Sequence, residues 1–262
     1  MTDRQRQQAE AFRALHEGDP FVIPNPWDAG SARVLEVLGF EALATTSSGF
    51  AFTLGKLDGE VTLDEVAAHV GALAAATALP VSVDLENGFG AEPEDAARAI
   101  TSVAEAGAVG GSIEDFDREG FLYEQGKAVE RIEGAVEAAR ALPFPFTLTA
   151  RAENHIRGNP DLADTISRLQ AYEEAGADVL YAPGLRSADE IRTVCEAVSK
   201  PVNVLAVPSL TVAEITGAGA QRVSVGGALT WVAVKAFADA ATALREGDLS
   251  PLAARVPLDD WF

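Results

Sequence analysis

Acidic side chains stand at the ends of two neighbouring hydrophobic runs. Asp84 and Glu86 close the segment PVSVDLE (80–86), and Glu114 lies near the end of VGGSIED (109–115). Residues two apart in an extended strand face the same side, and Glu114 can converge on the first pair from the next strand. Such carboxylates repel one another unless protons or a cation neutralise them, and oxygen ligands suit Mg²⁺ or Mn²⁺. The pattern predicts a metal site; helix capping and surface ion pairs are the alternative uses of these acids.

A basic side chain occupies the equivalent place further along the chain. Arg151 lies in FTLTARAE (146–153), where its guanidinium could bind a carboxylate through two parallel hydrogen bonds. The alternative is a structural ion pair with Glu114 or Glu153. Arg151 is therefore a candidate for binding an anionic substrate.

These residues are carried by a repeating unit, in which a short β-branched run is followed by an Ala-rich amphipathic helix. Parallel strands covered on both faces show such apolar runs, and Gly107, Gly176 and Gly219 each follow a helix, as helix-ending glycines do. Eight units favour an α/β fold of the (β/α)8 barrel class, a single domain over 1–262 with its core at about 20–246 and an N-terminal helix before it. Catalytic groups of such barrels stand at the C-terminal ends of the strands. The expected strands are 21–25, 40–46, 80–86, 109–115, 146–153, 177–183, 201–208 and 221–227.

Composition excludes several classes of function. The 262 residues carry a net charge of −20, which disfavours binding to nucleic acid or to an anionic membrane. No apolar run reaches the roughly 18 residues of a membrane span, and the N-terminus lacks the apolar segment of a signal peptide, so we expect a cytoplasmic protein. An anionic substrate would need local positive charge, such as a bound cation and an arginine. The single cysteine, Cys195, lies in a predicted amphipathic helix and is expected to be a packing residue.

Several motifs, in order along the chain, give a resemblance to a known family. NPWDAGSARVLEVLGFEALATTSSGFAFTLG, DLENGFG, SIED, TARAEN and RVSVGG together resemble the isocitrate lyase/phosphoenolpyruvate mutase superfamily over about residues 20–246. The resemblance implies a Mg²⁺-dependent barrel that makes or breaks C–C or P–C bonds next to a carboxylate. It also implies that the shared intermediate is the enolate of a 2-oxo acid.

The resemblance also implies roles for individual residues. Asp84 matches the direct metal ligand, while Glu86 and Glu114 match acids that reach the metal through water; Glu86 stands where many members have Asp. The remaining matches are the substrate-binding turn at Thr46, Ser47 and Ser48, the substrate-binding Asn203, the acid Asp58 near the leaving group, and the catalytic, substrate-clamping Arg151.

One loop departs from the family pattern. The segment 116–132 contains neither the Lys-Lys-Cys-Gly-His-type stretch of the lyases nor the Lys-Thr-Asn-Ser-like stretch of the mutases. Ordinary isocitrate lyase activity and phosphonate mutase chemistry both become less expected. Tyr123 and Lys127 are the candidates for a general acid within this loop, which we expect to close over the substrate.

The leading hypothesis is a Mg²⁺-dependent lyase that cleaves or decarboxylates a small 2-oxo- or 2-hydroxy-carboxylate. The alternatives are a P–C bond mutase or hydrolase acting on a phosphonopyruvate-like compound, and a silent barrel that binds a dicarboxylate. The resemblance further implies a homo-oligomer, dimer or tetramer, in which the last helix is exchanged between subunits. The segment 227–245 and the terminal Trp261 and Phe262 are the candidates for that contact.

Overall fold

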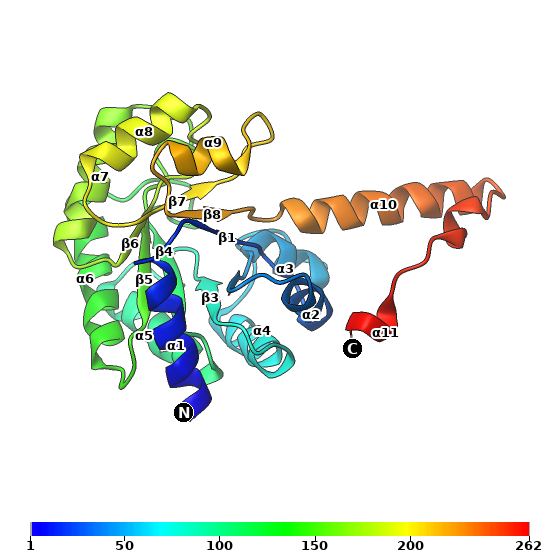
Figure 1. The fold of residues 1–262 in the computed structure, drawn as a ribbon. Coiled ribbons are helices and arrows are strands. Elements are labelled where there is room, and N and C mark those ends of the chain that lie inside the picture. Colours follow the sequence, from blue (N-terminus) through cyan, green and yellow to red (C-terminus); the bar gives the residue numbers. More distant parts are fainter. Residues whose placement is uncertain (1, 262) are drawn as a thin grey trace.

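The computed structural model describes residues 2–261, and its core is a (β/α)8 barrel (Figure 1). All strand pairs are parallel, in the order β1-β8-β7-β6-β5-β4-β3-β2. Ala44 N donates to Pro24 O at 3.1 Å, which joins β2 to the chain just after β1 and closes the ring. The predicted fold class is confirmed. The strands are β1 (Phe21–Ile23), β2 (Leu43–Ala44), β3 (Val81–Asp84), β4 (Gly110–Glu114), β5 (Thr147–Arg151), β6 (Val179–Tyr181), β7 (Val202–Leu205) and β8 (Arg222–Ser224).

The helices begin and end where local chemistry favours it. Capping boxes at Thr62, Ser187 and Thr211 satisfy free backbone N–H groups at helix starts. At the other end of α5, Gly107 adopts a φ of 118°, which L-residues rarely tolerate. The helices are α1 (Asp3–Leu15), α2 (Ala29–Val37), α3 (Ser47–Thr53), α4 (Leu63–Ala76), α5 (Pro93–Ala106), α6 (Gln125–Ala141), α7 (Leu162–Glu174), α8 (Ala188–Ala197), α9 (Val212–Gly217), α10 (Ala228–Arg245), η1 (Ser250–Ala253) and α11 (Leu258–Trp261).

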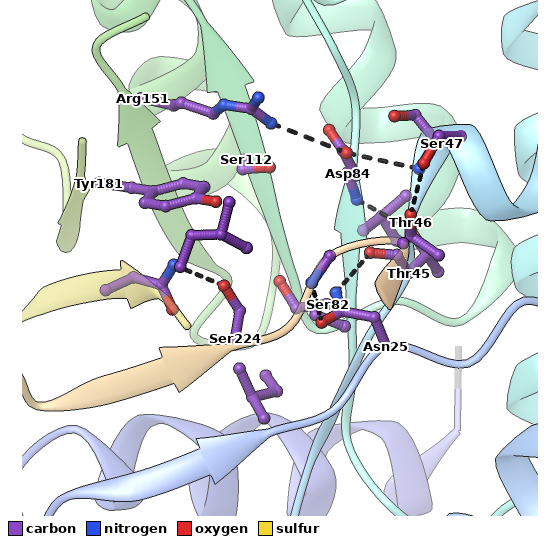
Figure 2. Close-up of a pocket in the computed structure, with 18 of the residues that line it drawn as sticks. Asn25, Thr45, Thr46, Ser47, Ser82, Asp84, Ser112, Arg151, Tyr181 and Ser224 are labelled. Carbon is purple, nitrogen blue, oxygen red and sulfur yellow. Dashed lines mark hydrogen bonds and ion pairs between the residues drawn. The ribbon is translucent and has the colours of Figure 1, made fainter. Parts of the chain in front are cut away.

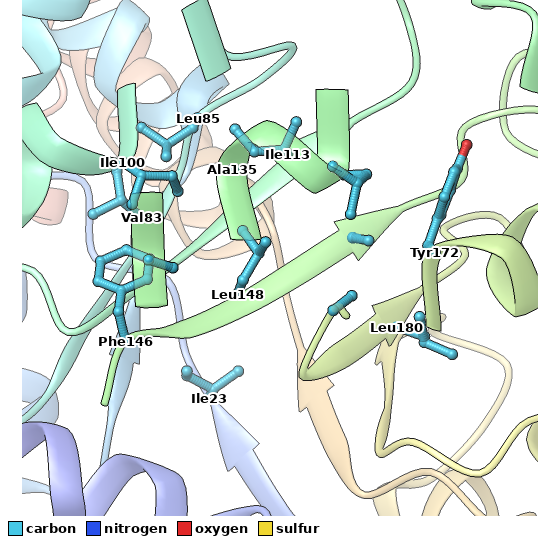
Figure 3. Close-up of a cluster of buried hydrophobic side chains, with 14 of the residues drawn as sticks. Ile23, Val83, Leu85, Ile100, Ile113, Ala135, Phe146, Leu148, Tyr172 and Leu180 are labelled. Atoms are coloured by element: carbon cyan, nitrogen blue, oxygen red, sulfur yellow. The ribbon is translucent and has the colours of Figure 1, made fainter. Parts of the chain in front are cut away.

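The strands of the central barrel present apolar residues outward and polar residues inward. Val83, Ile113 and Leu148 belong to the buried apolar cluster with Ile100 of α5 and Ala135 of α6 (Figure 3). The alternate positions carry Ser82, Asp84, Ser112 and Arg151, which line a cavity inside the barrel. Barrel interiors are usually filled by Val, Ile and Leu. Here Ser82 and Ser112 are smaller than those residues, so the interior keeps a cavity that a ligand could enter.

Helix α1 covers the N-terminal end of the barrel. Gln5 and Gln8 donate to backbone carbonyls that precede β3 and β4, and Gln221 returns the contact by donating to Leu15 O at 3.1 Å. Phe12 is fully buried, and a Cβ on Gly110 would approach its ring to 2.7 Å. Helix α1 therefore covers this end of the barrel, and the cavity extends to the C-terminal ends of the strands, where Asp84 and Arg151 line it.

Helix α10 projects away from the barrel, and the following segment turns back to place α11 against α2 (Figure 1). Within α10 only Thr230 is buried, Leu229 and Val234 are half-buried, and four large apolar side chains are exposed: Trp231, Val232, Phe237 and Leu244. The predicted exchange between subunits stays a prediction, and Phe262 lies outside the described residues. None of the helices in the range 2–261 combines the length and apolar character needed to cross a membrane.

Candidate active site

Two adjoining cavities meet at the C-terminal ends of the strands. The inner cavity, of about 180 Å³, runs from this opening into the barrel (Figure 2). The outer cavity, of about 360 Å³, lies beside the loops after β3 and β4. Ser47, Asp58 and Arg151 line both cavities, so the two form one continuous site.

Asp84 lines the inner cavity and contacts Ser47 and Arg151, two of the residues that line both cavities. Its Oδ2 accepts from Ser47 N at 3.4 Å and lies 3.8 Å from Arg151 Nη1. Its backbone N–H donates to Thr45 Oγ1 at 2.9 Å, which fixes the end of β3 against β2. This carboxylate thus faces a cation on one side and a backbone donor on the other (Figure 2).

The turn after β2 is the start of α3. Thr46 caps this helix by accepting from Gly49 N at 3.4 Å, and its Oγ1 lies 3.3 Å from Ser48 Oγ. A Cβ on Gly49 would approach Thr230 and Thr46 to 2.6 Å, so only glycine fits there. Thr46, Ser47 and Ser48 all line the inner cavity, which places the predicted substrate-binding turn on its wall.

Arg151 is surrounded by carboxylates. It pairs with Glu114 at 3.3 Å and makes a short contact with Glu153, and Arg157 reaches Glu153 at 2.7 Å. Burial by itself lowers the pKa of Arg151, but Glu114 and Glu153 outweigh it and raise the pKa well above the ordinary value. The structural ion pair considered as an alternative therefore exists, and it holds Arg151 against the cavity that it lines.

Glu86 and Glu114 are carboxylates in surroundings that disfavour their charge. Burial, reinforced by Asp84 and Asp58, raises the pKa of Glu86 to about 7 although Arg118 pairs with it at 3.0 Å. Burial together with Glu153 and Asp84 raises the pKa of Glu114 to about 8, against the opposing effect of Arg151. Glu86 also has a left-handed backbone, with φ of 49°, and its buried Oε1 has no hydrogen-bond partner among residues 2–261.

The donor set of these three acids suits a hard divalent cation. An added positive charge would lower the raised pKa values of Glu86 and Glu114 and would give the unpartnered Glu86 Oε1 a partner. Within residues 2–261, however, no three His, Cys, Asp or Glu side chains are already gathered closely enough to hold a metal. Arg151 and Arg118 stand as the cations among the acids instead.

Asp58 lies at the exposed rim, where it lines both cavities. Desolvation raises its pKa, which a hydrogen bond with Ser47 partly offsets. Asn203, on β7, lines the inner cavity and donates to Ser224 Oγ at 3.0 Å. Both predicted residues thus reach the site.

Tyr123 and Lys127 are not brought to either cavity. The Tyr123 hydroxyl makes a short hydrogen bond to Asp117 and accepts from Asn87 at 3.3 Å, and burial raises its pKa to about 12. Lys127 lies on α6 and pairs with Glu92 at 2.7 Å. Tyr123 turns to its partners because the loop folds back on itself, with Tyr123 N donating to Asp115 O at 2.9 Å.

Sequence reasoning missed several residues of the site. Arg118 and Arg157 line the outer cavity, and nothing in their local sequence pattern singles them out. Ser82, Ser112, Arg222 and Ser224 of the inner cavity could have been found, because polar positions alternate with apolar ones in their strands. Asn25, which follows β1, and Tyr181, which follows two apolar residues, show no such alternation. Cys195 lines neither cavity and packs against Gly219, and burial raises the pKa of its thiol to about 11.

Comparison with known proteins identifies the family of this chain. Residues 12–245 match the family described as phosphoenolpyruvate phosphomutase. A solved structure from Burkholderia cenocepacia, assigned as a lyase/mutase, is 54% identical, superimposes with a TM-score of 0.95, and matches over 99% of this chain and 96% of that one. The 2-methylisocitrate lyase of Halalkalibacterium halodurans is 33% identical, covering 89% of this chain and 80% of its own. An oxaloacetate decarboxylase of Bradyrhizobium diazoefficiens is 32% identical, covering 92% and 86%.

Proposed function

Because the chain belongs to the phosphoenolpyruvate phosphomutase family, within the isocitrate lyase/phosphoenolpyruvate mutase superfamily of lyases and mutases, we propose that it is a Mg²⁺-dependent carbon–carbon lyase. The substrate is a small 2-oxo- or 2-hydroxy-carboxylate, and the intermediate is an enolate. The observation that carries this proposal is the position of Asp84, between Arg151 and the backbone N–H of Ser47 at the opening of a barrel cavity. A positive charge and a backbone donor there face the place where an enolate would carry its negative charge.

The metal site consists of Asp84, with Glu86 and Glu114 acting through water. Mg²⁺, or Mn²⁺ in its place, would supply Lewis-acid stabilisation of the negative charge on the substrate oxygen. The three acids also fix the place of that charge in the site, because Asp84 ends β3, Glu114 ends β4, and Glu86 follows β3 by two residues.

The chain's own residues bind and orient the substrate. Arg151 takes a carboxylate group, and the Thr46–Ser48 turn directs backbone N–H groups at the developing oxyanion. In decarboxylation the bond from C3, the carbon next to the keto group, to the leaving carboxylate breaks, CO₂ departs, and the electron pair passes onto the keto oxygen to form the enolate. A proton added to that carbon then gives the 2-oxo acid. In cleavage of a hydroxy acid, the hydroxyl proton goes to a base, the C–C bond breaks, and its electron pair stays on the enolate fragment.

Asp58 is the residue that we place as proton carrier. It lines both cavities near the Ser47 turn, so it can reach a leaving group at the rim. Tyr123 and Lys127 have no place in this scheme, because Asp117 and Glu92 engage their side chains.

A substrate panel tests the proposal. The protein with Mg²⁺ is incubated with oxaloacetate, alkylmalates, methylisocitrate and phosphonopyruvate while pyruvate and inorganic phosphate are followed. Pyruvate released without phosphate from one of the carboxylates supports the lyase. Phosphate release from phosphonopyruvate would replace it with P–C chemistry, and thermal stabilisation without turnover would indicate a silent binding barrel.

We also propose that α10 packs against a second copy of this chain. Trp231, Val232, Phe237 and Leu244 have between 45% and 74% of their surface exposed on a helix that projects from its own barrel (Figure 1). An apolar surface of this kind on an extended arm is typical of an interface between subunits. The segment from α10 to α11 would then be the contact between protomers.

A further inference from the structure

The inner cavity ends on a buried cation that has no acidic partner. Arg222 is 5% exposed and lines the cavity, and no ion pair joins it to any acid among the described residues. Burial lowers the pKa of its guanidinium to about 10, which leaves it protonated at neutral pH. A buried charge without a counter-ion is unfavourable, so the site is suited to receiving an anion.

Neutral groups position this guanidinium without neutralising it. Its Nε donates to Asn203 Oδ1 at 2.8 Å, and its Nη2 donates to Thr149 Oγ1 at 3.1 Å. Its Nη1 contacts His16 Nε2 at 3.2 Å, while His16 Nδ1 donates to Phe12 O at 2.8 Å. Three of the five N–H groups of the arginine are used in this way, and the other two have no partner in the range 2–261.

Strand register connects this cation to the opening of the site. Arg151 is the last residue of β5 and pairs with Tyr181, the last residue of β6. Tyr181 pairs with Asn203 on β7, and Asn203 pairs with Arg222, the first residue of β8. The four paired residues Arg151, Tyr181, Asn203 and Arg222 therefore form one row across the strands, which runs from the C-terminal end of the barrel toward α1. With strands about 4.8 Å apart and tilted by roughly 36°, Arg222 lies about 8 Å deeper than Arg151.

Small polar side chains lie among the residues that line the cavity together with the two arginines, beside the apolar Ile23, Val83 and Leu205. Ser82, Ser112 and Ser224 line it, where a barrel usually has branched apolar residues (Figure 2). Hydroxyls can donate to a carboxylate, and their small volume leaves the cavity open as far as Arg222.

From these observations we infer that the floor of the barrel is an anion subsite, in which Arg222 binds the distal carboxylate of an elongated dicarboxylate whose other end is held near Arg151. Asn203 and Ser224 orient the arginine and complete the hydrogen bonding of the ligand. This inference rests on the proposed function only in identifying the cavity as the substrate site. It deepens that proposal by requiring two carboxylates and by assigning the second to the barrel interior.

The test is direct binding of succinate to the full-length protein in EDTA, measured by titration calorimetry, with acetate as the single-carboxylate probe. The informative variant is Asn203→Asp, which places an internal carboxylate against Arg222 while keeping the shape of the side chain. Because this carboxylate neutralises the guanidinium, we expect the melting temperature to stay equal or rise while succinate affinity falls at least about tenfold. Gln170→Glu, which adds the same charge at an exposed position on α7, is the matched control and should bind succinate as the wild type does.

A second pair of variants separates charge from packing. Arg222→Gln should lose succinate affinity at least as strongly, and Arg222→Lys should recover most of it. The inference is overturned if Asn203→Asp binds succinate as tightly as the wild type does, or if the wild-type protein binds acetate as tightly as succinate. Both results can be obtained even if Arg222→Gln does not fold. If the protein turns over a substrate and this activity is the same in the Arg222 variants, the subsite is refuted and the proposed lyase function stands. If succinate binding depends on Arg222 but no substrate is turned over, the proposed lyase function is refuted and the subsite stands.

Discussion

Arg118 Nη2 lies 3.0 Å from Glu86 Oε2, although the two residues belong to different loops at the edge of the barrel. The arginine also donates to Val61 O at 3.0 Å and lies over the ring of Phe89, with 4.6 Å from its guanidinium carbon to the ring centroid. A cation thus already occupies one side of a predicted metal-binding carboxylate.

This pair predicts an effect of Arg118→Ala on metal affinity. Arg118 lowers the pKa of Glu86, so its removal raises that pKa further, and the comparison is made at a pH where the carboxylate is ionised in both proteins. There the loss of the guanidinium makes the potential at Glu86 more negative, so Mg²⁺ should bind about 3- to 10-fold more tightly. Titration calorimetry with MgCl₂ measures the change. Arg98→Ala, which removes an exposed arginine paired with Asp95, is the control. Weaker Mg²⁺ binding in Arg118→Ala would mean that the arginine supports the metal site instead of competing with it.

Asp84→Ala should abolish Mg²⁺-dependent activity while the barrel stays folded. The carboxylate is the predicted direct ligand, and its loss should lower kcat/KM by about 10³-fold or more. Circular dichroism and steady-state kinetics on the same preparation measure both effects. Asp189→Ala, at a position whose side chain is 94% exposed on α8, should keep full activity. Full activity in Asp84→Ala would show that the metal assignment is wrong.

His16 predicts a dependence of stability on pH. Burial, with Arg222 nearby, lowers the pKa of His16 from 6.5 to about 3 in the folded protein. Between pH 6.5 and pH 3 His16 is therefore protonated in the unfolded chain and neutral in the folded protein. The contribution of neutral His16 to the free energy of unfolding is fully present above pH 6.5 and is lost as the pH falls toward 3. The loss should be about 1.4 kcal/mol per pH unit in that window.

Urea unfolding of the wild type and of His16→Gln at pH 7.5 and pH 5 measures this difference. Other groups titrate in both proteins and cancel, so the wild type should lose stability relative to the variant as the pH falls. A difference between the two proteins that does not change with pH would contradict the assignment of a neutral His16.

Phe237→Glu should weaken self-association. Phe237 is 74% exposed on α10, and a charge there would be buried without a partner at the proposed interface. Light scattering coupled to size-exclusion chromatography should show a dimer or tetramer for the wild type and a smaller species for the variant. Val212→Glu, which alters an exposed apolar residue on α9, serves as control. A monomeric wild-type protein would rule out the interface.

The sequence by itself determined the barrel and the acidic half of its site. Eight strand–helix units are visible as local periodicity, and in a parallel barrel all strand ends meet at one face. Asp84 and Arg151, each at the end of a strand, therefore had to approach one another, and their side chains stand 3.8 Å apart. Local spacing decides these positions because strand direction and side-chain alternation are properties of short segments.

Only the tertiary structure decided the partners of the other residues. Tyr123 turns to Asp117, Arg118 to Glu86, and Arg222 to Asn203 and His16. His16 and Arg222 are 206 positions apart, and they meet because α1 covers the end of the barrel and β8 begins beside it. Such contacts depend on the register between strands and on the packing of helices against the barrel. They cannot be predicted from the residue pattern within a short segment.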